Sequence, residues 1–352
     1  MRKYPVGIQS FEELRKGNYI YVDKTALIYR LVESGKYYFL SRPRRFGKSL
    51  LVSTLEAYFQ GKKELFGGLA MERLEDEWAE YPVLHVDLNT KKYENHSSLD
   101  EILNQHLEKW EAVYGDEKND RSPEERFSYI IEKISTVTGR NVVILIDEYD
   151  KPMLQAIGNE ELLADYRNTL KAFYGVMKSC DSYIKFALLT GVTKFSKVSV
   201  FSDLNNLMDI SLSDRFANIC GITEEELYRD FREDILELGQ RNGMGEKETK
   251  TALKERYDGY HFVKDGDDIY NPFSLLNTFA EMKFGSYWFE TGTPTFLVKL
   301  LQYSGYDLQR LAKEMASVDS LGGIDHMNTN PVPILYQSGY LTIKGYDSEF
   351  QV

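Results

Sequence analysis

The sequence has few of the residues that build disulfide frameworks or metal clusters. Its 352 residues include two cysteines, Cys180 and Cys220, without the paired spacing of a zinc site. Two isolated cysteines indicate reduced thiols in a cytosolic protein. The five histidines are scattered, and no two have the spacing of ligands on one helix face: His85, His96, His106, His261 and His326. We therefore assign no metal ion to cysteine or histidine.

Long apolar runs and an excess of positive charge are also missing. The longest apolar run is about half a dozen residues, far below the roughly 20 that cross a bilayer. The amino-terminal segment lacks the apolar core and the cleavage site of a signal peptide. The net charge of −12 argues against a uniformly basic nucleic-acid binder, although a local basic patch remains open. These features predict a cytoplasmic protein without membrane contact.

The first 221 residues alternate between expected strands and expected helices. Strands are predicted at 37–40, 81–88, 141–146 and 183–189, and a further short one at 207–211. Helices are predicted at 23–33, from 48 onward, and at 97–114, 123–137 and 160–178. The run at 141–146, NVVILI, is typical of a strand buried on both faces. The pattern predicts an α/β fold with a parallel sheet flanked by helices.

The pattern changes after residue 221. Thr223 and Glu226 have the spacing of a capping box, and charged helices follow to about residue 257. Further helices are expected to about residue 318. We predict a first domain over 1–221 and a smaller, mainly helical domain, lid-like or winged-helix-like, over 222–352. The end at 349–352 has no terminal signal, which predicts that the helical domain is cut before a further domain.

A phosphate-binding pattern lies between the first predicted strand and the following helix. Residues 42–49 read RPRRFGKS, which matches the last three positions of G-x-x-x-x-G-K-[ST], with Arg42 in place of the first glycine. Unpaired N–H groups and the dipole at a helix start attract phosphate. Lys48 would reach the β- and γ-phosphates of ATP, and the Ser49 hydroxyl would bind Mg²⁺. The predicted nucleotide contacts here are Arg44, Arg45, Phe46, Gly47, Lys48, Ser49 and Leu50. The alternative is a solvated basic turn between a strand and a helix.

Acidic residues follow the buried strand at 141–146. Asp147 would hold Mg²⁺, and Glu148 is placed to act as a general base toward the attacking water. Carboxylates at the carboxyl end of such a strand lie where open α/β sheets bind ligands. The alternative, that they are simply the first solvated loop residues, is weakened by the phosphate-binding pattern upstream. Asp150 is interpreted as a turn or helix-capping residue.

The next predicted strand also ends in polar residues. We place Thr190 among the nucleotide contacts. Thr190 or Thr193 would sense the γ-phosphate if this strand lies between the strands at 37–40 and 141–146. For each of the two threonines, the alternative is a structural role as a strand-end cap. Lys194 and Arg215 are weak candidates for the positive charge of an arginine finger. The Asn205–Asn206 pair is expected to have a structural role.

These motifs together resemble those of the additional-strand, catalytic-glutamate P-loop ATPases. More narrowly, the chain resembles the bacterial AAA-ATPase-like family, from residue 4 to about residue 340. The stretches that carry the resemblance are YPVGIQSFEELRKGNYIYVDKT, FLSRPRRFGKS, LIDEYDKP, LLTGVTKFS, NNLMDIS, CGITEEEL, YDGYHF and YNPFSLLN. Related archaeal ATPases carry a glycine where this chain has Arg42, so this departure belongs to the narrower family.

The resemblance also implies partners. In this family the ATPase region is usually followed by a PD-(D/E)xK nuclease-like domain, and this chain ends about where that domain would begin. Nucleic acid would then be contacted through a domain that this sequence lacks, and a homo-oligomer remains open. The region of Tyr19, Tyr21, Asp23 and Lys24 is implied to border the base of the nucleotide.

Three functions follow from the sequence. The leading hypothesis is a Mg²⁺-dependent ATPase, with Lys48 and Glu148 as catalytic residues, that gates an attached nuclease or another partner. A nucleotide-binding switch with little turnover is the alternative, favoured by Arg42 and by the lack of a clear arginine finger. A nucleic-acid-binding scaffold is the third, and the net charge argues against it.

Overall fold

The computed structural model describes residues 2–115, 121–195, 200–201, 204, 206–263, 266–291, 295–307, 309, 315–321, 330–343 and 345. His326, Asn205 and the chain end at 349–352, which the sequence analysis singled out, lie outside the described residues.

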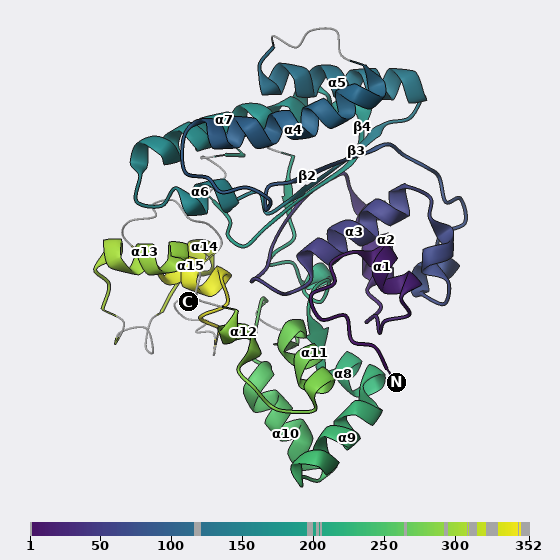
Figure 1. The fold of residues 1–352 in the computed structure, drawn as a ribbon, viewed down its shortest axis with the longest axis vertical. Helices are drawn as coiled ribbons and strands as arrows, with labels where there is room; N and C mark the ends of the chain where they lie inside the picture. Colours follow the sequence, from purple (N-terminus) through teal and green to yellow (C-terminus); the bar gives the residue numbers. More distant parts are fainter. Residues whose placement is uncertain are drawn as a thin grey trace.

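A five-stranded parallel sheet forms the centre of the molecule, with the order β2-β3-β4-β1-β5 (Figure 1). The strands are β1 (Tyr37–Ser41), β2 (Val83–Asp87), β3 (Val142–Asp147), β4 (Ile184–Gly191) and β5 (Met208–Asp209). The ends of all five strands lie within two residues of the segments predicted from sequence, and β5 is shorter than expected. The predicted α/β fold with a parallel sheet flanked by helices is confirmed.

Helices cover both faces of the sheet because its strands are apolar on both sides. In β3, Ile144 and Ile146 contribute to one hydrophobic cluster, and Val143 and Leu145 contribute to the other. One face packs against α4 (Ser97–Tyr114), α5 (Pro123–Thr138), α6 (Lys151–Gln155) and α7 (Glu160–Ser179). The opposite face packs against α1 (Phe11–Lys16), α2 (Thr25–Ser34) and α3 (Lys48–Phe59) (Figure 1). Short 3₁₀ helices lie at η1 (Lys63–Phe66), η2 (Ala70–Arg73), η3 (Asp181–Tyr183) and η4 (Asp214–Phe216).

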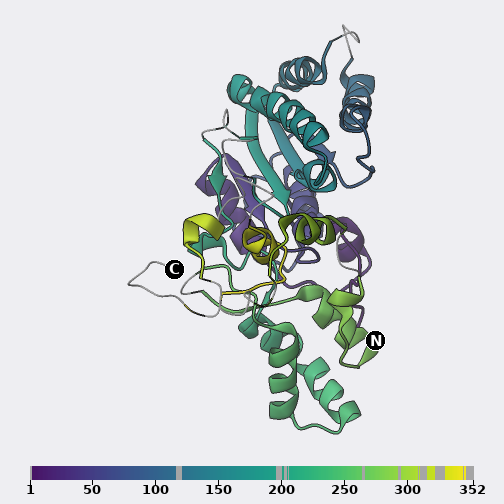
Figure 2. The same ribbon diagram turned by 90° about the vertical axis from the view of Figure 1, so that its left-hand side faces the viewer.

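The part of the chain after residue 221 is mainly helical, as predicted. It begins with β6 (Ile222–Thr223), which pairs antiparallel with β7 (Ile269–Tyr270) after α10. Its helices are α8 (Glu224–Asp230), α9 (Arg232–Asn242), α10 (Glu246–Tyr257), α11 (Pro272–Glu281), α12 (Tyr287–Glu290), α13 (Thr295–Ser304), α14 (Val318–Leu321) and α15 (Val332–Gln337). The first four of these helices form a separate lobe, seen below the sheet in Figures 1 and 2. The boundary at residue 221 stays a prediction.

Two connections tie this helical part to the sheet domain. The lobe has its own apolar core, and Tyr4, Ile20 and Val22 from the amino-terminal segment pack against that core. Leu300 of α13 and Ile334 of α15 return to the main cluster beside the sheet. The chain therefore crosses between the two parts more than once, and the crossings surround the start of α3. In the described part of the chain, no helix is both long enough and apolar enough to cross a membrane.

Candidate functional site

The loop between β1 and α3 has the backbone that a phosphate-binding loop needs. Gly47 precedes the first residue of α3 with φ of +93°, a left-handed conformation that glycine adopts without a steric penalty. No atom lies within 4 Å of the position where a Cβ would stand, so the start of the helix is open for a ligand. Arg45 also has a positive φ, +67°. The first N–H groups of a helix have no intrahelical acceptor, so those of α3 are available to a ligand at this turn.

Lys48 is buried beneath this loop, with 4% of its surface exposed. Its Nζ donates to the carbonyl oxygens of Arg42 at 3.1 Å and Pro43 at 3.4 Å. The Oε1 atom of Glu148 lies 3.4 Å from the same Nζ. Two segments that the sequence separates by 100 residues thus place the predicted phosphate ligand and the predicted general base in contact.

Arg42 excludes, for its own position, one alternative that the sequence left open. A solvated basic turn is wrong for this residue, because only 1% of it is exposed. Its guanidinium donates to the carbonyl oxygens of Ser41, Ser211 and Ala217, the last two at 2.7 and 3.1 Å. It also lies 4.1 Å from the ring centroid of Phe262. Burial lowers the pKa of Arg42, and these carbonyl and ring contacts compensate for the lost hydration. The residue that replaces the motif glycine anchors the loop to the chain after residue 210.

Restoring the motif glycine should therefore weaken the fold. We expect Arg42→Gly to lower the free energy of unfolding by about 3 kcal/mol, because three buried carbonyls lose their donor. Urea unfolding followed by circular dichroism measures the change. Arg45→Gly is the matched control: Arg45 is exposed and has a positive φ, so its replacement should leave stability within about 0.5 kcal/mol. Equal stability of Arg42→Gly and wild type would contradict the anchoring role.

The other loop residues divide between the ligand side and the helical part. Phe46 is buried against Tyr260 and Phe262, with ring centroids 4.6 and 5.8 Å away. The carbonyl oxygen of Arg44 accepts from Trp288 Nε1 at 3.2 Å, while the Arg45 guanidinium lies over the ring of Phe273. The helical part thus packs against one side of the phosphate-binding loop, and the other side is open to a ligand.

Asp147 ends β3 and is 5% exposed. Its Oδ1 accepts a hydrogen bond from the hydroxyl of the buried Thr190 on β4. β4 lies between β3 and β1, the two strands that lead into the acidic motif and the phosphate-binding loop. This central position is the one that a γ-phosphate sensor on this strand requires. Thr190 fixes the carboxylate beside the phosphate-binding loop. Glu148 follows with φ of +56°, and this left-handed turn directs it toward Lys48 instead of along the strand.

Asp150 has the structural role expected of it. The residue is fully buried, and its carboxylate accepts from the N–H groups of Val192 and Thr193 and from the Thr193 hydroxyl, the last at 2.7 Å. Burial and the nearby Glu148 carboxylate raise the pKa of Asp150. Thr193 is thereby engaged in shaping the turn after β4.

The two weak candidates for an arginine finger have other contacts in this chain. Lys194 forms an ion pair with Asp209 on β5. Arg215 donates to the hydroxyl of Ser34, which precedes β1, and therefore lies toward the end of the sheet opposite the phosphate-binding loop. Neither residue lines the pocket in front of the loop.

Two pockets adjoin the start of α3. The first, called here the polar pocket, has a volume of about 560 Å³ and is lined by Gln9, Arg44, Arg45, Gly47, Lys48, Ser49, Leu50, Asn89, Glu148, Lys151, Leu154, Gln155, Val192, Thr291, Thr295 and Phe296. The second, the apolar pocket, has a volume of about 90 Å³. Its lining includes Ile20, Tyr21, Lys24, Ile28, Phe46, Gly47, Leu50, Thr54, Cys220, Ile222, Phe231 and Leu276. Gly47 and Leu50 line both pockets, so the two pockets adjoin the same turn at the start of α3.

The structure places two of the four amino-terminal residues at the apolar pocket. Tyr21 and Lys24 line it. Asp23 instead accepts hydrogen bonds from Thr25 and from the N–H of Ala70. The ring of Tyr19 lies near the ammonium of Lys3.

Other lining residues were missed by the sequence reasoning. Lys151 directly follows the acidic motif and donates to Asn89, so its place beside Glu148 was a usable signal. Asn89, Ile222 and Phe231 carry no local signal, since the fold alone brings them to the two pockets.

The oxygen ligands for a divalent cation are few. Among the described residues no group of three or more His, Cys, Asp or Glu side chains is placed to hold a metal ion. The Ser49 hydroxyl in the first turn of α3 and the Asp147 carboxylate are the protein oxygens that the motifs offer. One or two such ligands suit Mg²⁺, which completes its shell with water and phosphate oxygens.

Two comparisons with known proteins give matches to this chain. A family model described as "Predicted AAA-ATPase" matches residues 5–201. A protein of Azotobacter chroococcum mcd 1, described as an uncharacterized protein in the vnfD 5′ region, is 38% identical over 343 residues, or 97% of this chain. The chain spans 64% of the length of that relative.

Proposed function

Because this chain belongs to the family described as "Predicted AAA-ATPase", we propose that it binds ATP with Mg²⁺ and hydrolyses the terminal phosphate. The observation that carries the proposal is that Gly47 and Leu50, at the start of α3, line both the polar pocket and the apolar pocket. The polar pocket offers Lys48, Ser49 and Glu148 to a triphosphate. The apolar pocket on the other side of the same glycine offers a place for the base.

The charges in the polar pocket suit an anionic ligand. Lys48 is held by two carbonyls and by Glu148, contacts that a β- or γ-phosphate oxygen replaces with a stronger charge-assisted bond. Arg44 and Arg45 line the same pocket and add positive charge. The N–H groups at the start of α3 add further donors. The triphosphate therefore takes the place of Glu148 as the partner of Lys48.

The proposed chemistry assigns one role to each motif residue. Ser49 and Asp147 would hold Mg²⁺, and Thr190 keeps the Asp147 carboxylate in place. When bound, Mg²⁺ neutralises charge that develops on the phosphate oxygens. Glu148, released from Lys48, accepts the proton of the attacking water. Lys48 stays on the phosphates and stabilises the charge of the transition state.

A direct test is phosphate release by the wild-type protein. We expect ATP to bind and to be hydrolysed only when Mg²⁺ is present, and an excess of EDTA to stop phosphate release at once. Calorimetry measures binding, and a coupled phosphate assay measures turnover. The absence of ATP binding in the presence of Mg²⁺ would refute the proposal. Tight binding with less than one turnover per hour would favour the nucleotide-binding switch instead.

We also propose that the ATPase serves a partner. The relative is longer than this chain, which spans 64% of its length. The resemblance stated from the sequence implies an attached nuclease-like domain, and gating of such a domain stays a prediction. Comparing the nucleic-acid cleavage of a longer relative in ATP and in ADP would test it.

A further inference from the structure

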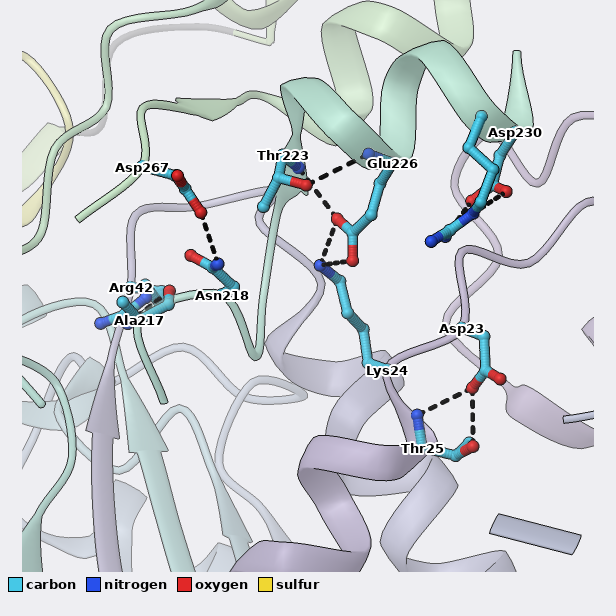
Figure 3. A network of polar contacts seen from close by, with 11 residues as sticks. Asp23, Lys24, Thr25, Arg42, Ala217, Asn218, Thr223, Glu226, Asp230 and Asp267 are labelled. Carbon is cyan, nitrogen blue, oxygen red and sulfur yellow. Dashed lines mark hydrogen bonds and ion pairs between the residues drawn. The ribbon is translucent and has the colours of Figure 1, made fainter. Parts of the chain in front are cut away.

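Lys24 and Glu226 form a buried ion pair between the amino-terminal segment and the helical part. The Lys24 ammonium lies 2.6 and 2.5 Å from the two carboxylate oxygens of Glu226 (Figure 3). The two side chains are 9% and 14% exposed. Burial lowers the pKa of Lys24, and the Glu226 carboxylate opposes that shift. An ion pair taken out of water this far requires good geometry, which the two short contacts supply.

Both partners are fixed by their own surroundings. Glu226 belongs to the capping box of α8: its Oε2 accepts from the N–H of Thr223 at 2.9 Å, and the Thr223 hydroxyl accepts from the N–H of Glu226. Lys24 stands between Asp23, which holds the N–H groups of Thr25 and Ala70, and the first residue of α2. The pair therefore joins the turn before α2 to the capping turn of α8, as Figure 3 shows.

The position of the pair is at the apolar pocket. Lys24 lines this pocket, and so do Cys220, Gly221 and Ile222, which lead into the capping turn of α8. Leu50 and Thr54 in the first turns of α3 also line the pocket. The ion pair thus fixes the distance between the amino-terminal wall and the helical wall of the pocket.

We propose that Lys24 and Glu226 are positioning residues for the nucleoside part of the ligand. The inference rests on the proposed function, since it takes the apolar pocket as the site of the base. The pair sets the width of that pocket, so it governs the affinity for ATP and not the affinity for a triphosphate without a base. The triphosphate contacts belong to Lys48 and Ser49 in the polar pocket, which the pair does not touch.

The test compares two ligands, Mg²⁺-ATP and Mg²⁺-tripolyphosphate. Glu226→Gln keeps an oxygen acceptor for the Thr223 N–H but removes the charge, and Lys24→Met keeps most of the side-chain volume. Each variant should bind ATP about tenfold more weakly, because an unpaired charge or an open wall borders the base. Tripolyphosphate affinity should stay within about twofold of the wild-type value. The double variant should lose less than the sum of the two single losses.

Asp234→Asn is the matched control. Asp234 is buried and accepts hydrogen bonds from Arg2 and Tyr4, so it also joins the amino-terminal segment to the helical part. It does not line the apolar pocket. This variant should leave the ratio of the ATP and tripolyphosphate affinities unchanged.

Three results would overturn the inference: unchanged ATP affinity in both single variants, an equal loss for both ligands, or the same change of the ratio in Asp234→Asn. A failure of the proposed function gives a different result, since the binding of neither ATP nor tripolyphosphate would then depend on Lys48. Thermal unfolding of each variant shows whether it is folded at the assay temperature, and the ratio of the two ligands in the same protein sample cancels a loss of active protein.

Discussion

Replacing Lys48 by alanine should reduce the affinity for Mg²⁺-ATP at least about a hundredfold, equivalent to roughly 3 kcal/mol. The Lys48 ammonium is buried under the phosphate-binding loop, where a bond to a phosphate oxygen is poorly screened by water. Alanine leaves the triphosphate without that charge and leaves a space beneath the loop. Titration calorimetry at constant Mg²⁺ measures the loss.

Lys151→Ala is the control for this experiment. Lys151 lines the same polar pocket, but its ammonium is bound to Asn89. Both variants therefore remove one positive charge from the polar pocket, but only Lys48→Ala removes it from beneath the phosphate-binding loop. We expect Lys151→Ala to change ATP affinity by no more than about threefold. If Lys48→Ala bound ATP as well as wild type did, the loop would not be a phosphate site.

Much of the fold was predictable because its signals are local. The apolar, β-branched run at 141–146 marks β3, and the alternation of strands with helices sets the parallel sheet. The two motifs could then be placed at the same edge, since parallel strands present their carboxyl ends together. The contact between Lys48 and Glu148 agrees with that reasoning. The capping box of Thr223 and Glu226 was predicted in the same way, from spacing alone.

The remaining features depend on contacts between distant segments. From sequence alone Arg42 looks like a solvated residue. The carbonyl oxygens of Ser211 and Ala217 that accept its hydrogen bonds lie about 170 residues further along the chain. Lys24 meets Glu226 across 202 residues. No periodicity or spacing in one segment reveals a partner in another. Sequence reasoning therefore predicted the phosphate-binding motifs and, through the resemblance, the amino-terminal wall of the apolar pocket, but it missed the helical wall with Ile222 and Phe231.

Replacing Glu148 by glutamine should separate binding from hydrolysis. The amide has the same size but cannot accept the proton of the attacking water, so we expect turnover to fall by about 10²- to 10³-fold. ATP affinity should stay the same or rise by up to about tenfold, because Lys48 no longer has Glu148 as a competing partner. Glutamine tolerates the positive φ at this position about as well as glutamate does. Single-turnover phosphate release and calorimetry measure the two effects.

Asp87→Asn is the matched control for Glu148→Gln. Asp87 ends β2 and stands opposite Asp147 in the sheet register, so it lies at the same sheet edge, yet it does not line the polar pocket. Replacing the Asp87 carboxylate by an amide should change the rate of ATP turnover by no more than about threefold. Unchanged turnover in Glu148→Gln would remove Glu148 from the role of general base. Loss of ATP binding in the same variant would instead assign its carboxylate to holding the loop, because the ion pair with Lys48 is the contact that links it to that loop.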